Sequence, residues 1–180
     1  LPTPKPDAPI TDAEALAIEA LEGLIAAPPE RALPLVKRVL AGNQTPRVKQ
    51  RALFVLGMID LPEAKSLLVD TARSSKGELQ SEAIRALGIR GGRDLAASLG
   101  EIYQSGDANA RRAVIEAYMI SDNKDGLLAI AKSAKSKSDS REAIHALGAM
   151  GAVAELSELR SSGQITADLI QAFAIANDLD

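Results

Sequence analysis

Few side chains in this sequence could take part in catalysis or bind a metal. Among the 180 residues there is no cysteine and one histidine, His145, so disulfides, thiolate catalysis and cysteine-ligated zinc are excluded. A metal ion needs several ligands, and no second histidine is present to share one with His145. Because successive helical residues are about 100° apart, His145 is expected to point outward from an apolar helix face as a solvated residue. We expect no catalytic residue, no metal site and no cofactor.

A basic stretch is the second candidate site. Lys132, Lys135 and Lys137 lie close together in a segment rich in serine and alanine, and Arg141 follows them. Such a run is usually a solvated loop, and the alternative is a binding site for an acidic protein segment or an anionic headgroup. Nucleic acid is not the expected ligand, because the net charge is −3 and no tryptophan offers a stacking platform. No apolar run approaches the roughly 18 to 20 residues that would span a membrane.

The glycine-rich segment 88–94 (GIRGGRD) resembles a phosphate-binding loop only superficially. It follows a predicted helix rather than a strand, and it lacks the Gly-Lys-Ser/Thr ending of such loops. We therefore expect a helix C-cap and a turn at this point.

An internal repeat dominates the sequence. Four similar segments begin at residues 52 (ALFVLG), 83 (AIRALG), 113 (AVIEAY) and 143 (AIHALG), so the period is 30 or 31 residues. Positions one, two and five of each copy are small or aliphatic, and at about 100° per residue they fall on one face of a helix. Each copy is followed by a turn and a second apolar stretch. The repeating unit is therefore predicted to be helix, turn, helix.

Weaker copies extend the repeat toward both ends of the chain. One begins at residue 17 (AIEALE), and a last degenerate copy begins near Leu169. Thr11 and Glu14 have the spacing of a capping box, which predicts that the first helix begins there.

The last motif position holds glycine in three of the four main copies, at Gly57, Gly88 and Gly148. Because glycine has no Cβ, these residues are predicted to allow a close approach of neighbouring helix backbones. Tyr118 takes this position in the copy that begins at residue 113. Either the stack opens locally there or the ring turns into the surface groove, and we expect simple packing rather than ligand contact.

Helix pairs of about 30 residues resemble HEAT repeats, in particular the short bacterial form of the phycobilisome lyase HEAT-like type. The resemblance is clearest over residues 48–68 (VKQRALFVLGMIDLPEAKSLL), with an apolar helix, a turn at Asp60 and the Pro62 opening of a second helix. It implies an all-α fold, a right-handed α-solenoid or armadillo-like superhelix of about five HEAT-like helix pairs plus a terminal helix. The second helix of each pair is expected on the concave side. The repeat domain is expected at residues 11–180, behind a proline-rich tether at residues 1–10.

A solenoid exposes much surface without forming a closed pocket, and the resemblance implies a non-catalytic scaffold or adaptor that binds another protein. The alternatives are an enzyme-accessory or lyase-like HEAT protein and a structural spacer of a longer chain. The second helices supply the expected partner-binding residues, which are Lys65, Asp70, Arg73, Glu101, Gln104, Lys132 and Lys135. The alternative site is a hydrophobic patch formed by Phe54 and Ile115, which share the outward motif position of His145.

The first residues bear on the location of the protein. Residue 1 is Leu1 rather than an initiator methionine, and Pro2, Pro4, Pro6 and Pro9 follow. This pattern favours a tether that remains after an export signal is removed. We expect a periplasmic protein, with a cytoplasmic one as the alternative.

Overall fold

The computed structural model describes residues 9–177, except for the side chains of residues 93 and 94. Over this range it contains eleven α-helices, one short 3-10 helix and no strand. The all-α prediction is confirmed. The chain forms two compact units, residues 1–67 and 68–180, and the boundary falls within α4 (Pro62–Ser74). The tether expected at residues 1–10 lies, up to residue 8, outside the described residues.

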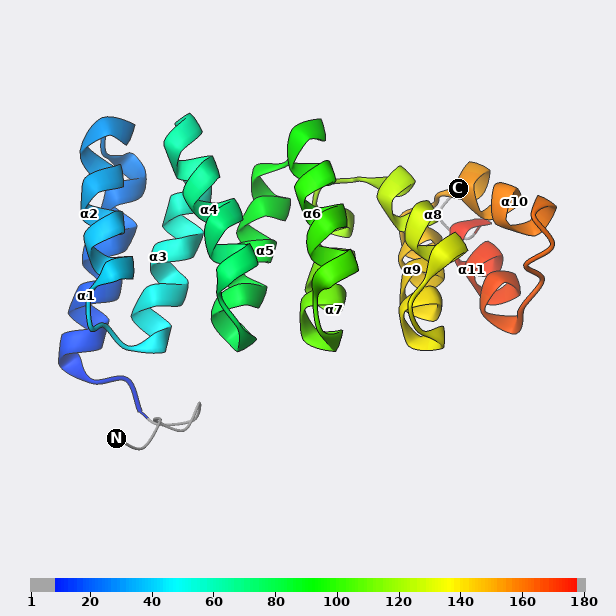
Figure 1. Ribbon diagram of the computed structural model, residues 1–180, viewed down its shortest axis with the longest axis horizontal. Coiled ribbons are helices and arrows are strands. Elements are labelled where there is room, and N and C mark those ends of the chain that lie inside the picture. The colour runs from blue at the N-terminus through cyan, green and yellow to red at the C-terminus, as the bar shows by residue number, and fades with distance from the viewer. Residues whose placement is uncertain (1–8, 178–180) are drawn as a thin grey trace. The chain divides into compact units, whose positions relative to one another are not determined.

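The first unit contains the first three helices and the start of α4 (Figure 1). Here α1 (Asp12–Gly23) leads through the 3-10 helix Leu24–Ala26 to α2 (Pro29–Ala41), and α3 (Pro46–Met58) follows. Both α1 and α2 contact α3. The weak motif copy that begins at residue 17 therefore lies on α1, and the copy that begins at residue 52 lies on α3.

The second unit begins with the end of α4 and then alternates the first and second helices of the repeat. The first helices are α5 (Gly77–Arg90), α7 (Ala108–Ile120), α9 (Lys137–Ala149) and α11 (Ala167–Asn177), and the second helices are α6 (Arg93–Ser105), α8 (Lys124–Ser133) and α10 (Val153–Ser161). Contacts of α7 with α5 and α9, and of α9 with α11, place the first helices in a row.

Two opposite edges of the second unit are formed by different turns (Figure 1). One edge holds the turns from a first helix to its second helix. The other edge, which we call the return edge, holds the turns from a second helix to the next first helix. Its turns are residues 75–76, 106–107, 134–136 and 162–166.

Local signals account for several helix ends. The amide of Glu14 donates to the Thr11 hydroxyl at 3.2 Å, and the Thr11 amide donates to the Glu14 carboxylate at 3.1 Å. This is the predicted capping box. At the end of α5, Gly91 has φ +65°, a left-handed conformation that favours glycine. The glycine-rich segment 88–94 is therefore a helix end and a turn, as predicted.

The core follows the predicted helix faces. Positions one, two and five of all four main motif copies are buried, with exposed fractions of 4% or less. On α5, for example, Ala83, Ile84 and Leu87 have no exposed surface. Because aromatic residues are 2% of the chain, this core consists mainly of small and branched aliphatic side chains, which suit close helix packing.

Two motif glycines bring helix backbones together. A Cβ on Gly88 would lie 2.7 Å from the Cα of Ala117, and a Cβ on Gly148 would lie 2.8 Å from the Cα of Ala172. The backbone of α5 therefore meets α7, and that of α9 meets α11, as predicted for these glycines. Tyr118, which replaces the motif glycine on α7, is 4% exposed. Its ring is packed inside the protein, in agreement with the expectation.

Candidate interaction surface

Neighbouring second helices are joined by ion pairs on their solvent side. These pairs are Lys37–Glu63 in the first unit and Arg73–Glu101 and Lys132–Glu158 in the second. All six side chains are more than one-third exposed, so water screens each pair and its contribution to stability is at most about 1 kcal/mol. Three of the predicted partner-binding residues, Arg73, Glu101 and Lys132, therefore already form ion pairs with other residues of this protein.

The other predicted partner-binding residues are placed differently. The Lys135 ammonium donates to the backbone carbonyl of Gln104, near the C-terminus of α6, where the helix dipole favours a cation. Asp70 is exposed on the part of α4 that belongs to the second unit, whereas Lys65 is half-buried on the part that belongs to the first. The role of these residues in partner binding stays a prediction.

Two exposed lysines on the return edge have no partner in the described part of the protein. Lys76 lies in the α4–α5 turn, and Lys137 is the first residue of α9. Neither forms a hydrogen bond or an ion pair through its ammonium group with another described residue. Both charges are available to an incoming anion, in contrast to those of Lys132 and Lys135.

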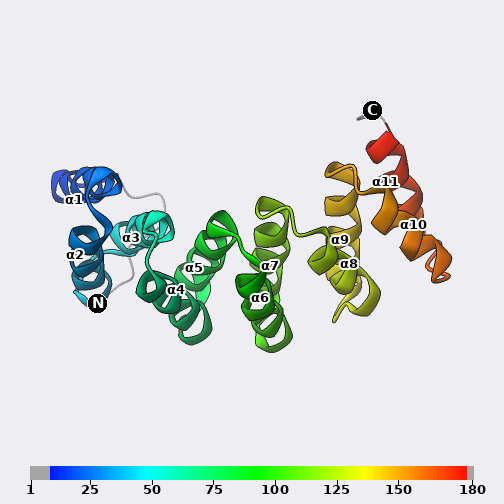
Figure 2. The ribbon, with the colours of Figure 1, turned by 90° about the horizontal axis from the view of Figure 1, so that it is seen from above.

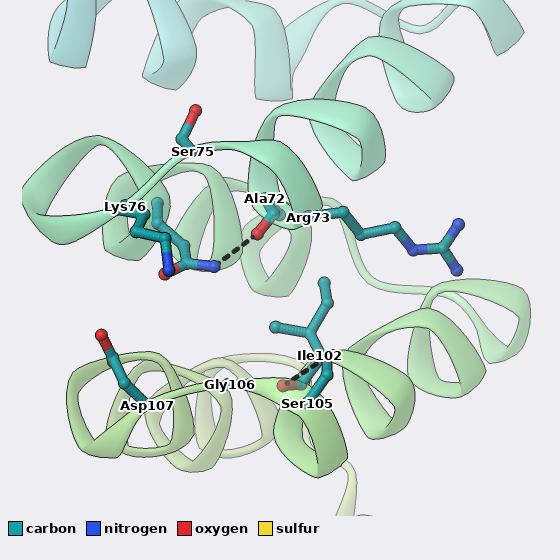
Figure 3. A pocket seen from close by; sticks show the side chains of 9 residues that line it. Ala72, Arg73, Ser75, Lys76, Ile102, Ser105, Gly106 and Asp107 are labelled. Atoms are coloured by element: carbon teal, nitrogen blue, oxygen red, sulfur yellow. Dashed lines mark hydrogen bonds between the residues drawn. The ribbon is translucent and has the colours of Figure 1, made fainter.

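A shallow pocket of about 180 Å³ opens on the return edge, between the α4–α5 and α6–α7 turns (Figure 3). Lys76 and Asp107 lie on facing sides of it, and Arg73 extends away from it. The Gln80 amide, also in the lining, donates to the Ala72 carbonyl at 2.8 Å. Asp107 is the only acidic lining residue, and it accepts a hydrogen bond from a backbone amide of α7. The lining thus offers polar and charged contacts.

The predicted hydrophobic patch of Phe54 and Ile115 is wrong. Ile115 is 3% exposed and belongs to the core of the second unit, while Phe54 is half-buried in the first. The guanidinium of Arg51 also covers the Phe54 ring, 4.6 Å from its centroid. The prediction assumed a single buried stripe per helix, but α7 is contacted by α5, α6, α8 and α9, so its buried face is wider.

His145 is partly exposed, with 38% of its side chain accessible, and it lies beside an acid of the next first helix. Its Nε2 atom is 3.5 Å from Oδ1 of Asp168, and the Nε atom of Arg141 is 3.3 Å from the same oxygen. Across the described residues, no group of three or more histidine, cysteine, aspartate or glutamate side chains is placed to hold a metal ion.

A comparison with known families agrees with this packing. Residues 33–120 match the family model described as HEAT repeats. They extend from α2 to the end of α7 and contain three of the four main motif copies. The match supports a likeness of these residues to HEAT repeats. No curated protein matches the chain. Within residues 9–177, no helix is long and apolar enough to cross a membrane.

A buried polar cluster connects helices that are distant in sequence. Asp139 of α9 is 7% exposed, and its Oδ2 atom accepts hydrogen bonds from the Tyr103 hydroxyl at 2.9 Å and from Nε of Arg111 at 2.7 Å. Arg111 also donates to the Gly106 carbonyl at 3.2 Å, and the Lys135 amide donates to the Tyr103 hydroxyl oxygen at 3.3 Å. We call Tyr103, Arg111 and Asp139 the Asp139 cluster. It joins α6 and α7 to α9.

The charge states within the cluster follow from its contacts. Burial by itself would raise the pKa of Asp139. The carboxylate also accepts hydrogen bonds from Ser136, Arg111 and Tyr103 and lies beside the Arg111 charge, and together these effects outweigh burial and lower the pKa. Burial raises the pKa of Tyr103, and the neighbouring Asp139 carboxylate raises it further. At neutral pH the carboxylate is therefore ionised and the phenol protonated, as both hydrogen bonds require.

The stability of the protein should fall in acid through the Asp139 carboxyl group. Because the pKa of Asp139 is lower in the folded state, its contribution is complete above the ordinary aspartate pKa and is lost as the pH falls through the folded value. We expect the difference in free energy of unfolding between the parent protein and Asp139→Asn to shrink between neutral pH and about pH 3. Urea titrations at several pH values measure it.

Glu142→Gln serves as the control for this titration. It removes the Arg112–Glu142 pair, whose side chains are 65% and 32% exposed, so water already screens the interaction. Its difference from the parent should stay small at every pH. If the Asp139→Asn difference is equally independent of pH, the carboxylate is not the stabilising group.

Sequence reasoning missed the Asp139 cluster. Tyr103, Arg111 and Asp139 come from three helices, and no local motif connects them. The available signal was that Asp139 is the one acid within residues 132–141, a stretch interpreted as basic. An isolated acid among cations at a helix start is compatible with a surface residue, and only the packing of α9 against α6 and α7 buries it.

Proposed function

We propose that this protein is a non-catalytic scaffold that binds an acidic segment of another protein along the return edge of its second unit. The observation that carries the proposal is the presence of two exposed, unpaired lysines on that edge, Lys76 and Lys137, beside neighbours whose charges are engaged. HEAT repeats present extended surfaces rather than closed sites, which suits a binding role.

The chemistry of the edge supports an acidic protein partner over nucleic acid. Lys76 and Lys137 lie at the α4–α5 turn and next to the α8–α9 turn, so they attract carboxylates and increase the rate of encounter. Aromatic side chains that would stack on bases are missing from the exposed part of this edge: Tyr103, the aromatic residue of α6, is 2% exposed.

Affinity capture with the full chain tests the proposal through charge reversal. Lys76→Glu and Lys137→Glu should each reduce capture of the partner several-fold at low salt, because each replaces an attraction by a repulsion, and the loss should diminish at high salt. Lys124→Glu is the matched control. It makes the same change in charge at the start of α8, on the opposite edge, where Lys124 also lacks a partner among the described residues.

The outcomes separate the candidate surfaces. Equal capture by the parent and all three variants would contradict binding at the return edge. Binding that depends neither on salt nor on these lysines would point instead to exposed apolar side chains on the opposite edge, which are Ile89, Met119, Ile120 and Val153. Capture of no protein under any condition would favour a structural spacer.

Two further predictions accompany this proposal, and each is tested by a separate measurement. The nearer likeness to the bacterial phycobilisome lyase HEAT-like type predicts an accessory role beside an enzyme, which the identity of the captured partner would test. The periplasmic location stays a prediction, and fractionation of the native host would test it.

A further inference from the structure

Neighbouring first helices of the second unit are not all packed alike. Gly88 and Gly148 place backbone against backbone between α5 and α7 and between α9 and α11. Between α7 and α9 the same motif position holds Tyr118, and the two helices meet over a smaller part of their length. In both ribbon views α8 and α9 stand apart from α6 and α7 (Figures 1 and 2). We call the interface of α6 and α7 with α8 and α9 the seam.

Aromatic and polar groups fill the seam. Away from the return edge, the Tyr118 hydroxyl donates to the Ala96 carbonyl of α6 at 3.0 Å. Its ring lies against Gly126 of α8, where a Cβ would be 2.7 Å from Cε2 of the ring. At the return edge, the Asp139 cluster closes the seam with directional hydrogen bonds. Both tyrosines of the sequence, Tyr103 and Tyr118, therefore lie in this one interface.

The chain crosses the seam through the short α7–α8 turn, residues 121–123. Asp122 in this turn has φ +51°, and it is the only non-glycine residue of the described chain with a positive φ. Aspartate is among the few non-glycine residues that tolerate this left-handed region, and the conformation makes the turn sharp. Asn123 fixes the start of α8, because its Oδ1 atom accepts from the Gly126 amide at 2.9 Å. A turn of this length between anchored helix ends can act as a pivot.

We propose that the second unit bends at the seam as two blocks, α5–α7 and α8–α11, about the α7–α8 turn, with the Asp139 cluster as the latch. Loosening a glycine interface would forfeit close apolar contact between two backbones. Opening the latch breaks a few hydrogen bonds, but their donors and acceptors then become accessible to water. Hydrogen bonds with water replace those that are lost, so the net cost in free energy is small. Opening the seam therefore costs less free energy than unfolding either block.

Distances between spin labels test this inference. The sequence contains no cysteine, so introduced cysteines are the sole labelling sites. Ala97 of α6 and Ala129 of α8 are exposed on opposite sides of the seam, whereas Ala129 and Ala154 of α10 are exposed within one block. Both pairs join neighbouring second helices. In double electron–electron resonance, Ala97→Cys/Ala129→Cys should give a broader distance distribution than Ala129→Cys/Ala154→Cys.

Variants of the latch complete the test. Asp139→Asn and Tyr103→Phe should each broaden the distribution across the seam and leave the distribution within the block unchanged. Glu142→Gln removes the exposed Arg112–Glu142 pair that crosses the same seam, and it should change neither. A distribution across the seam that is unaffected by Asp139→Asn would overturn the proposal. Broadening of both distributions would also overturn it, since the cluster would then hold the whole unit together.

Discussion

Leu87→Asp should lower the free energy of unfolding by roughly 4 kcal/mol or more. Leu87 is on α5 and has no exposed surface. Truncating a buried leucine costs about 2 to 5 kcal/mol by itself, and aspartate adds a charge that has no partner in this apolar environment. Urea unfolding followed by far-UV circular dichroism measures the loss.

Ile89→Asp provides a matched comparison on the same helix. Ile89 is two residues further along α5 and is 37% exposed, so the new carboxylate can remain hydrated. We expect this variant to lose less than about 1 kcal/mol. Similar losses for the two substitutions would mean that the buried face of α5 has been assigned incorrectly.

Gly88→Ala should destabilise the protein by about 1 to 3 kcal/mol, although alanine is the better helix former. A Cβ at this position would lie 2.7 Å from Cα and 2.8 Å from the carbonyl oxygen of Ala117. These are backbone atoms and cannot rotate away, so α5 and α7 must separate. Thermal or urea unfolding of the parent and the variant gives the change in stability.

Gly23→Ala should have the opposite sign. Gly23 ends α1 with φ −59°, a helical value, and no atom lies within 4 Å of the position of an added Cβ. Alanine there should raise stability by about 0.5 to 1 kcal/mol, because it restricts the unfolded chain. If Gly88→Ala were also stabilising, the backbones of α5 and α7 could not be in direct contact.

The structure gives Tyr118 a packing role that its position in the repeat did not indicate. In the sequence, Tyr118 replaces the glycine that the other three main copies have at the last motif position. In the fold its ring occupies space left by Gly126 and its hydroxyl reaches the Ala96 carbonyl. The departure from the repeat therefore marks the interface that we propose as the bending point.

The candidate interaction surface was only partly predictable. The sequence pointed to the second helices and to the basic stretch around Lys132 and Lys135 as binding elements, but the structure gives both lysines partners inside the protein. The unpaired lysines, Lys76 and Lys137, are equally basic in the sequence. Lys132 and Lys135 differ from Lys76 and Lys137 because a neighbouring repeat places an acid or a carbonyl within reach of their ammonium groups. Whether it does so depends on how each repeat is shifted and rotated against the next.

By itself the sequence determined the helix–turn–helix period, the buried motif positions, the capping box at Thr11 and the close approach at Gly88 and Gly148. These features depend on helical periodicity and on the presence or absence of a Cβ, which are properties of short segments. Only the tertiary structure decided the burial of Ile115 and the assembly of the Asp139 cluster. Both depend on the rotation and spacing of neighbouring helices, which arise when several faces pack together and which the pattern of one helix does not specify.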